Sequence, residues 1–105
     1  MTTELQSLTL ALRQFAAERN WAPFHSPKNL ATALSVESAE LLEHFQWLTD
    51  AQSQTLSEEK RVKVGYEMAD VLLYLLQLAD KLDIDLADAA NCKMALNAEK
   101  YPVVS

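Results

Sequence analysis

The stretch Val71-Leu-Leu-Tyr-Leu-Leu-Gln-Leu-Ala79 decides the fold, because it holds no charge and no residue that breaks a helix. Proline is absent between residues 28 and 101, so the stretch belongs to a long predicted helix. This helix is apolar almost all the way round, whereas a helix on the surface of a single domain has a polar side. In a chain of 105 residues, a helix covered on all sides indicates a contact between copies. We therefore expect a homodimer or homotetramer.

The rest of the chain predicts further helices around this one. Apolar residues at helical spacing predict four helices, at residues 3–19, 27–48, 58–81 and 85–100. The predicted caps are Ser26, followed by Pro27 at the first helical position, then Ser57 and Asp85. Residues 20–28 and 49–57 read as connections. The expected fold class is all-α, a four-helix bundle in one domain spanning residues 1–105.

Composition excludes several classes of protein. One Gly and three Pro do not supply the turns of an all-β fold, and a lone cysteine excludes a disulfide framework. The chain carries 15 acidic against 9 basic residues, a formal charge of −6, which disfavours a nucleic acid polymer as partner. No apolar run reaches the roughly 18–20 residues of a membrane span, and the N-terminus lacks the features of a signal peptide. A cytoplasmic protein without a membrane partner is expected.

Two pairs of acidic residues stand where apolar residues would be expected. On the helix at 27–48, Glu37 lies at the apolar stripe and Glu40 lies one turn further on. On the helix at 58–81, Glu67 and Asp70 repeat this arrangement. If the two stripes pack together, four carboxylates converge, and their mutual repulsion requires a cation between them. Oxygen-only ligands favour Mg²⁺, with Mn²⁺ as a substitute. The alternative is that both pairs form solvated faces.

Two other groups of residues are suited to a nucleotide. Lys93 and Asn97 continue an apolar line on the helix at 85–100 and are able to hold phosphate oxygens. The alternative is a lysine that extends along an exposed face. The aromatic residues and the imidazole of Trp21, His25, Trp47 and Tyr74 are typical of a nucleobase pocket. The alternative for these aromatic rings is a role as core anchors.

Taken together, these motifs carry a family resemblance over residues 8–102. They are Phe15-Ala-Ala-Glu-Arg-Asn-Trp21, Phe24-His-Ser-Pro-Lys-Asn-Leu30, Glu37-Ser-Ala-Glu-Leu41, Phe45-Gln-Trp47, Glu67-Met-Ala-Asp-Val-Leu-Leu-Tyr74 and Lys93-Met94 with Asn97 and Lys100-Tyr-Pro102. In this order the chain resembles the all-α nucleoside triphosphate pyrophosphatases of the MazG-like superfamily, and most closely their dCTP pyrophosphatase branch.

The resemblance implies hydrolysis of a nucleoside triphosphate, dCTP or a modified dCTP, to the monophosphate and pyrophosphate, an activity that cleans the nucleotide pool. It implies a catalytic Mg²⁺ site formed by Glu37, Glu40, Glu67 and Asp70. It also implies phosphate contacts from Lys93, Asn97, Lys100 and Tyr101, and a base pocket formed by Trp21, His25, Trp47 and Tyr74. Three alternatives remain open: the same chemistry on dUTP, the same chemistry on a phosphoribosyl nucleotide, and a non-catalytic helical dimer that binds a nucleotide or a partner protein.

Overall fold

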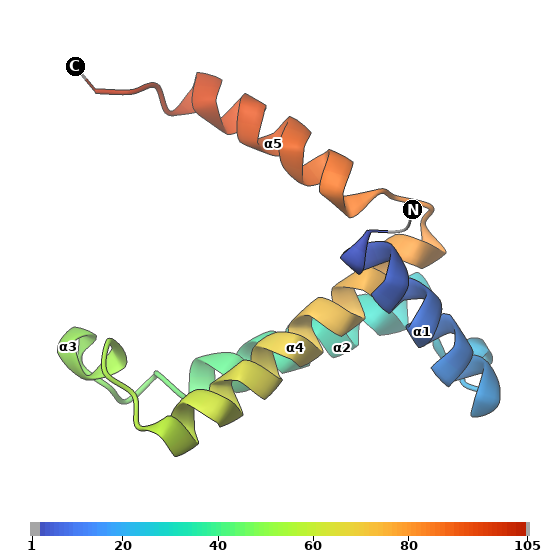
Figure 1. Cartoon of the computed structure of the whole chain (residues 1–105), viewed down its shortest axis with the longest axis horizontal. Coiled ribbons are helices and arrows are strands. Elements are labelled where there is room, and N and C mark those ends of the chain that lie inside the picture. Colours follow the sequence, from blue (N-terminus) through green and yellow to red (C-terminus); the bar gives the residue numbers. More distant parts are fainter. Residues whose placement is uncertain (1–2, 105) are drawn as a thin grey trace.

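The chain folds into helices joined by short connections (Figure 1). A computed structural model describes residues 3–104. Its elements are α1 (Glu4–Glu18), the 3-10 turn η1 (Ala22–Phe24), α2 (Pro27–Glu43), α3 (Asp50–Ser53), α4 (Glu58–Lys81) and α5 (Leu86–Lys100). This described part contains no strand, which confirms the predicted all-α class. None of its helices has the length and apolar character needed to cross a bilayer.

The predicted helix starts are confirmed. The side-chain oxygens of Ser26, Ser57 and Asp85 each accept a hydrogen bond from the backbone N–H three residues further on, at 3.0–3.2 Å. Pro27 occupies the first position of α2, where its missing N–H costs no hydrogen bond. These caps fix where α2, α4 and α5 begin, and so they fix the register of every site residue on those helices.

Helices α1 and α4 each end at a left-handed residue that is not glycine. Asn20 after α1 and Asp83 after α4 both adopt the left-handed conformation, each with φ of 54°. The next residue in each case closes the helix end, by Trp21 N–H to the Ala16 carbonyl at 3.0 Å and by Ile84 N–H to the Ala79 carbonyl at 2.9 Å. Asn and Asp tolerate this conformation better than other side chains. A chain with a single glycine thus turns sharply at two helix ends.

The prediction that the second helix continues to residue 48 is wrong, because α2 ends at Glu43. Apolar spacing continues to Leu48, but residues 44–48 form tighter turns, as in the bond from Leu48 N–H to the Phe45 carbonyl. These turns are followed by Thr49, which caps the short helix α3 through a reciprocal pair of hydrogen bonds with Gln52. The Thr-x-x-Gln spacing is the signal that would have revealed α3.

The single glycine lies inside a helix and offers a test of the α4 surface. Gly65 is exposed on α4, and a Cβ atom added there meets no atom within 4 Å. We expect Gly65→Ala to raise the free energy of unfolding by about 0.5–1 kcal/mol, because alanine loses less backbone entropy in a helix. Chemical denaturation measures the change. A loss of stability would contradict this prediction and indicate that another chain approaches position 65.

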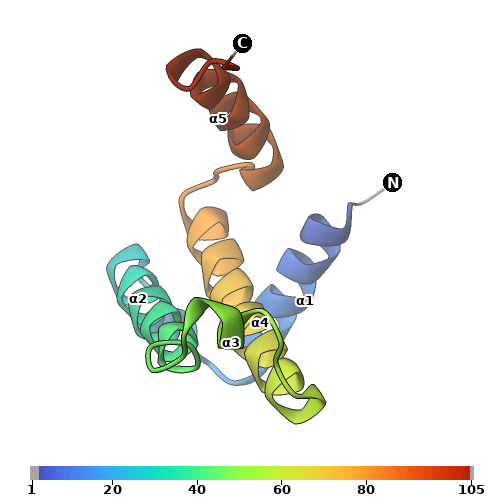
Figure 2. The same ribbon diagram turned by 90° about the vertical axis from the view of Figure 1, so that its left-hand side faces the viewer.

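Helix α4 is the centre of the packed part of the chain. It packs against α2 on one side and, over a shorter length, against α1 on the other (Figure 2). The buried residues at these contacts are Leu30, Val64, Leu76 and Ala79. The Arg13 guanidinium joins α1 to α4 by donating two hydrogen bonds to the Asp80 carboxylate, one of them at 2.8 Å. This contact lowers the pKa of Asp80.

Helix α5 leaves the packed helices at Asp83 and extends away from them (Figures 1 and 2). The radius of gyration is 16.8 Å, against about 13 Å for a compact chain of this length. The accessible surface is 8358 Å², whereas a compact monomer of this mass exposes about 5,900 Å². Large apolar side chains on α2, α4 and α5 are exposed. A single copy therefore leaves far more surface in water than a stable monomer of its size.

Candidate metal and nucleotide site

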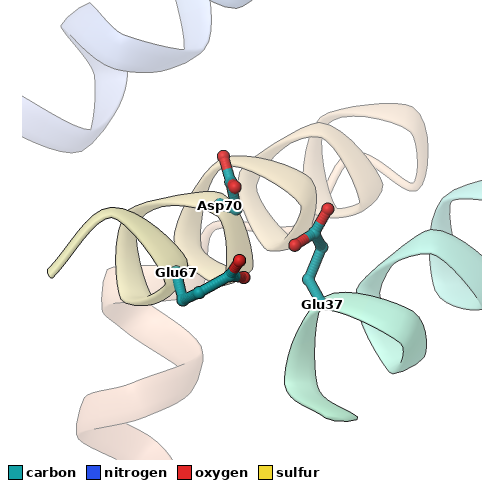
Figure 3. Close-up of side chains that lie close together, drawn as sticks. All are labelled: Glu37, Glu67 and Asp70. Atoms are coloured by element: carbon teal, nitrogen blue, oxygen red, sulfur yellow. The ribbon is translucent and has the colours of Figure 1, made fainter. Parts of the chain in front are cut away.

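Carboxylates from two helices meet where α2 packs against α4 (Figure 3). Glu37 extends from α2, and Glu67 and Asp70 extend from α4, with one oxygen from each within 4.8 Å of the others. The Glu40 carboxyl, one turn further along α2, adjoins that of Glu37. The structure thus brings together the four acidic residues that the sequence singled out.

The packing of the two helices explains why these acids converge. Leu30 on α2 and Val64 on α4 are buried. Glu37 lies two turns after Leu30, and Glu67 lies one turn after Val64, so each acid shares a face with a core residue. Packing the apolar faces against each other therefore draws the two carboxylates together.

The cluster is electrostatically unfavourable without a cation. Burial, carboxyl contacts with Glu40 and Glu67, and the charges of Glu40 and Asp70 raise the pKa of Glu37 from 4.5 to about 7. Near neutral pH the Glu37 carboxyl therefore retains a proton in a large fraction of molecules. Such a shift marks a group that is poised to exchange its proton for a cation.

The hydrogen bonding of the cluster matches a metal site. Within residues 3–104, Glu37 Oε2 and Glu67 Oε2 are buried and have no hydrogen-bond partner. None of the ion pairs in the same part of the chain reaches any of the four acids. Buried, unpartnered carboxylate oxygens are costly unless they coordinate a cation. A donor set made only of carboxylates is suited to Mg²⁺ or Mn²⁺.

The predicted base-binding residues are divided between the two ends of α2. The Trp21 and His25 rings lie before α2, with centroids 5.9 Å apart in an edge-on contact. Trp47 follows α2 and is 86% exposed. The 17 residues of α2 separate these positions by about 25 Å. One chain therefore does not bring these three side chains together, whereas Tyr74 lies one turn after Asp70, near the carboxylates.

The aromatic group before α2 is larger than the sequence indicated. Phe15, interpreted as part of the apolar stripe of the first helix, lies edge-on to Trp21 with centroids 5.5 Å apart. The Arg19 guanidinium covers the Phe15 ring at 3.4 Å from its centroid. The spacing of four residues between Phe15 and Arg19 on one helix would have indicated this contact from the sequence.

The predicted phosphate-binding residues are not beside the carboxylates of their own chain. Lys93, Asn97 and Lys100 are all on α5, which extends away from α2 and α4 (Figure 1). Lys100 Nζ lies 5.3 Å from the centroid of the Tyr101 ring, so these two residues do lie together. The structure therefore separates the acidic and basic halves of the predicted site.

Fold and site together define an all-helical protein with a carboxylate site suited to a divalent cation. Comparison with known proteins specifies the family. The family model described as "MazG-like family" matches residues 32–105, most of the chain. The chain belongs to the MazG-like family.

The chain is also similar to individual members. It is 45% identical over 92 residues to dCTP pyrophosphatase 1 of Bos taurus and 45% identical over 91 residues to that of Homo sapiens, matches that cover 86% and 85% of the chain. In each case the match covers 54% of the relative, so the chain spans about half the length of these curated relatives. The crystal structure of a pyrophosphatase from Archaeoglobus fulgidus is 39% identical, with a TM-score of 0.79 over 98% of this chain and 96% of that one.

Proposed function

We propose that this protein hydrolyses a nucleoside triphosphate between its α and β phosphates, releasing the monophosphate and pyrophosphate. The observation that carries the proposal is the group of converging carboxylates with two buried, unpartnered oxygens. The similarity to proteins named dCTP pyrophosphatase 1 favours dCTP or a modified dCTP as substrate. The reaction would remove surplus or modified dCTP from the cytoplasmic nucleotide pool.

Glu37, Glu40, Glu67 and Asp70 would hold Mg²⁺. The bound cation would supply the positive charge that allows a protein with a formal charge of −6 to hold a polyphosphate. The buried oxygens of Glu37 and Glu67 are the natural first ligands, because they have no other partner in the described part of the chain. Glu37 would give up the proton that it retains near neutral pH when it serves as a ligand.

A general base is also required, because the attacking water must lose a proton. Glu40 is outside the group of three mutually close carboxylates, yet it adjoins Glu37. We assign the proton-accepting role to Glu40, whose carboxylate is the one least committed to the cation. Glu37, Glu67 and Asp70 would then be the principal ligands of the cation, and Glu40, at the edge of the group, would orient and deprotonate the water.

The substrate also needs contacts to its base and phosphates. We assign the phosphates to Lys93, Asn97, Lys100 and Tyr101, and the base to Trp21, His25, Trp47 and Tyr74. The separation of these groups within one chain and the large exposed apolar surface both support a homodimer or homotetramer as the active form.

A nucleotide panel tests the proposal. Purified protein is incubated with dCTP, 5-methyl-dCTP, dUTP, the other dNTPs and a phosphoribosyl nucleotide, with Mg²⁺ or with EDTA, and pyrophosphate is measured. We expect Mg²⁺-dependent release, greatest with dCTP or its 5-methyl derivative. A preference for dUTP would change the substrate and keep the chemistry. Absence of turnover on every nucleotide, together with retained nucleotide binding in titration calorimetry, would indicate a non-catalytic binding protein and overturn the proposal.

A further inference from the structure

A small cavity opens between α1 and the last turns of α4. Its volume is about 220 Å³, whereas sites for whole drug-sized ligands measure about 300–1,000 Å³. The space therefore suits one part of a larger molecule, such as a single ring. Ala16, Ala17 and Ala22 line it with small side chains, and His25 and Gln77 supply polar groups. Small apolar walls with a few polar groups are typical of a site for a heterocycle.

The cavity lies on the same face of α4 as the acidic cluster. Asp70, Tyr74 and Gln77 follow one another at intervals of four and three residues, so they share a helical face. The distance along α4 from Asp70 to Gln77 is about 10 Å, which is comparable to the length of one nucleoside. A nucleotide whose phosphates meet the carboxylates therefore reaches the cavity with its base. The edge-on contact between the His25 and Trp21 rings joins the cavity to the predicted base-binding residues.

The structure fixes the orientation of the Gln77 amide at this cavity. Its Nε2 donates a hydrogen bond to the Leu73 carbonyl at 3.2 Å. No other hydrogen bond within residues 3–104 involves the Gln77 side chain, so its Oε1 is free to accept one. Turning the amide over would bring Oε1 against the Leu73 carbonyl oxygen and lose the existing bond. The free atom of the amide is therefore an acceptor.

Other polar side chains that line the cavity already have partners or offer only donors. The Asp80 carboxylate accepts both hydrogen bonds from Arg13. The Thr9 hydroxyl donates to a backbone carbonyl of its own helix at 2.9 Å, and a lysine such as Lys81 has no acceptor atom. Oε1 of Gln77 takes part in none of these contacts, which leaves it available to a bound ligand.

We propose that Gln77 is a specificity-determining residue, whose Oε1 accepts a hydrogen bond from the 4-amino group of a cytosine base held in the cavity. The inference rests on the proposed function for the nucleotide itself. Cytosine carries a donor at position 4, whereas the uracil ring carries an acceptor there. A uracil base in the same place would oppose Oε1 with its own O4, and both oxygens would lack a partner. Gln77 therefore selects dCTP over dUTP.

A comparison of three nucleotides tests this role. Wild-type protein and Gln77→Met, which removes the amide and keeps the length of the side chain, are given dCTP, dUTP and the 2-pyrimidinone analogue of dCTP, which lacks the 4-amino group. We expect the wild type to favour dCTP by on the order of tenfold, the effect of one hydrogen bond. Gln77→Met is expected to lose this preference through a lower kcat/KM for dCTP. If it keeps the preference, the proposal fails. Gln54→Met, at the exposed end of α3, is the matched control.

Titration calorimetry separates this inference from the proposed function, because binding of a monophosphate requires no turnover. We expect the wild type to bind dCMP more tightly than dUMP, and Gln77→Met to bind the two equally. This pattern in a protein that hydrolyses no nucleotide would reject the proposed function and retain the role of Gln77. Equal binding of the two monophosphates by the wild type, or binding of neither, overturns the inference whatever the activity.

A second variant tests whether the base occupies the cavity. Ala22→Leu places a larger apolar side chain at the wall of the cavity and leaves the four carboxylates unchanged. We expect the Kd for dCMP to rise by on the order of tenfold, because an overfilled site excludes the ring or distorts its surroundings. The increase in Tm on adding Mg²⁺ is expected to equal that of the wild type, which controls for the fold. An unchanged Kd for dCMP would place the base elsewhere and overturn the proposal.

Discussion

Glu67→Gln and Asp70→Asn are each expected to lower kcat/KM for the proposed substrate dCTP by on the order of 10³-fold, a loss typical of removing a group that stabilises charge in the transition state. Each variant keeps the size of the side chain and removes one negative ligand from the cluster. The matched control is Glu58→Gln on the same helix, because that side chain is 81% exposed and pairs with Arg61 at 3.6 Å. The activity of all three variants is measured as pyrophosphate release with saturating Mg²⁺. The control is expected to have the activity of the wild type.

Stability without bound metal is expected to change in the opposite direction. Removing one of several like charges from a partly buried cluster relieves repulsion, so Glu67→Gln is expected to raise Tm in EDTA. Added Mg²⁺ then raises the Tm of the wild type more than that of the variant, since ligand binding stabilises the folded state by mass action. A variant that is both inactive and less stable in EDTA would contradict a role in metal binding and indicate a structural one.

The stability of the metal-free protein is expected to fall as pH rises from about 5 to about 7.5. The pKa of Glu37 is about 7 in the folded chain, against an ordinary value of 4.5. A raised carboxyl pKa favours the folded state fully below the unfolded value, and this contribution is lost as pH rises through the folded value. The fall in Tm is expected to be several degrees, because each kcal/mol corresponds to about 4–8 °C for a chain of this size.

Two further measurements connect this pH dependence to Glu37. Glu37→Gln is expected to abolish the fall in Tm between these pH values, whereas Glu58→Gln is expected to retain it. The increase in Tm on adding Mg²⁺ is expected to grow over the same interval in the wild type, because the cation competes with the Glu37 proton. A wild-type Tm in EDTA that stays level from pH 5 to pH 7.5 would show that Glu37 has an ordinary pKa.

The acidic site was predictable because it depends on local spacing. Acids three residues apart on each of two helices lie on one helical face, and the core residues Leu30 and Val64 mark which face turns inward. The caps Ser26 and Ser57 were predictable for the same reason, since each acts on a backbone N–H three residues away. The end of α2 could not be predicted in this way. Apolar residues continue at helical spacing to Leu48, but the chain has already left the helix and forms turns before Thr49.

The arrangement of α5 and of the aromatic residues was beyond the reach of sequence spacing. A helical face identifies Lys93 and Asn97 as neighbours, but it does not identify which helix, or which copy, covers them. The distance between Trp21 and Trp47 depends on α2 standing between them, so their separation is visible only in three dimensions. The structure therefore divides the predicted site residues into two groups that do not lie together within one chain.

The identity of the phosphorus-containing products tests the central claim most directly. Wild-type protein is incubated with dCTP and Mg²⁺, and the products are followed by ³¹P nuclear magnetic resonance. The proposed chemistry predicts dCMP and pyrophosphate in equal amounts from the first turnover, with neither product formed in EDTA and with formation by Glu67→Gln slower by on the order of 10³-fold. Formation of dCDP and inorganic phosphate would place the cleavage between the β and γ phosphates and contradict the account.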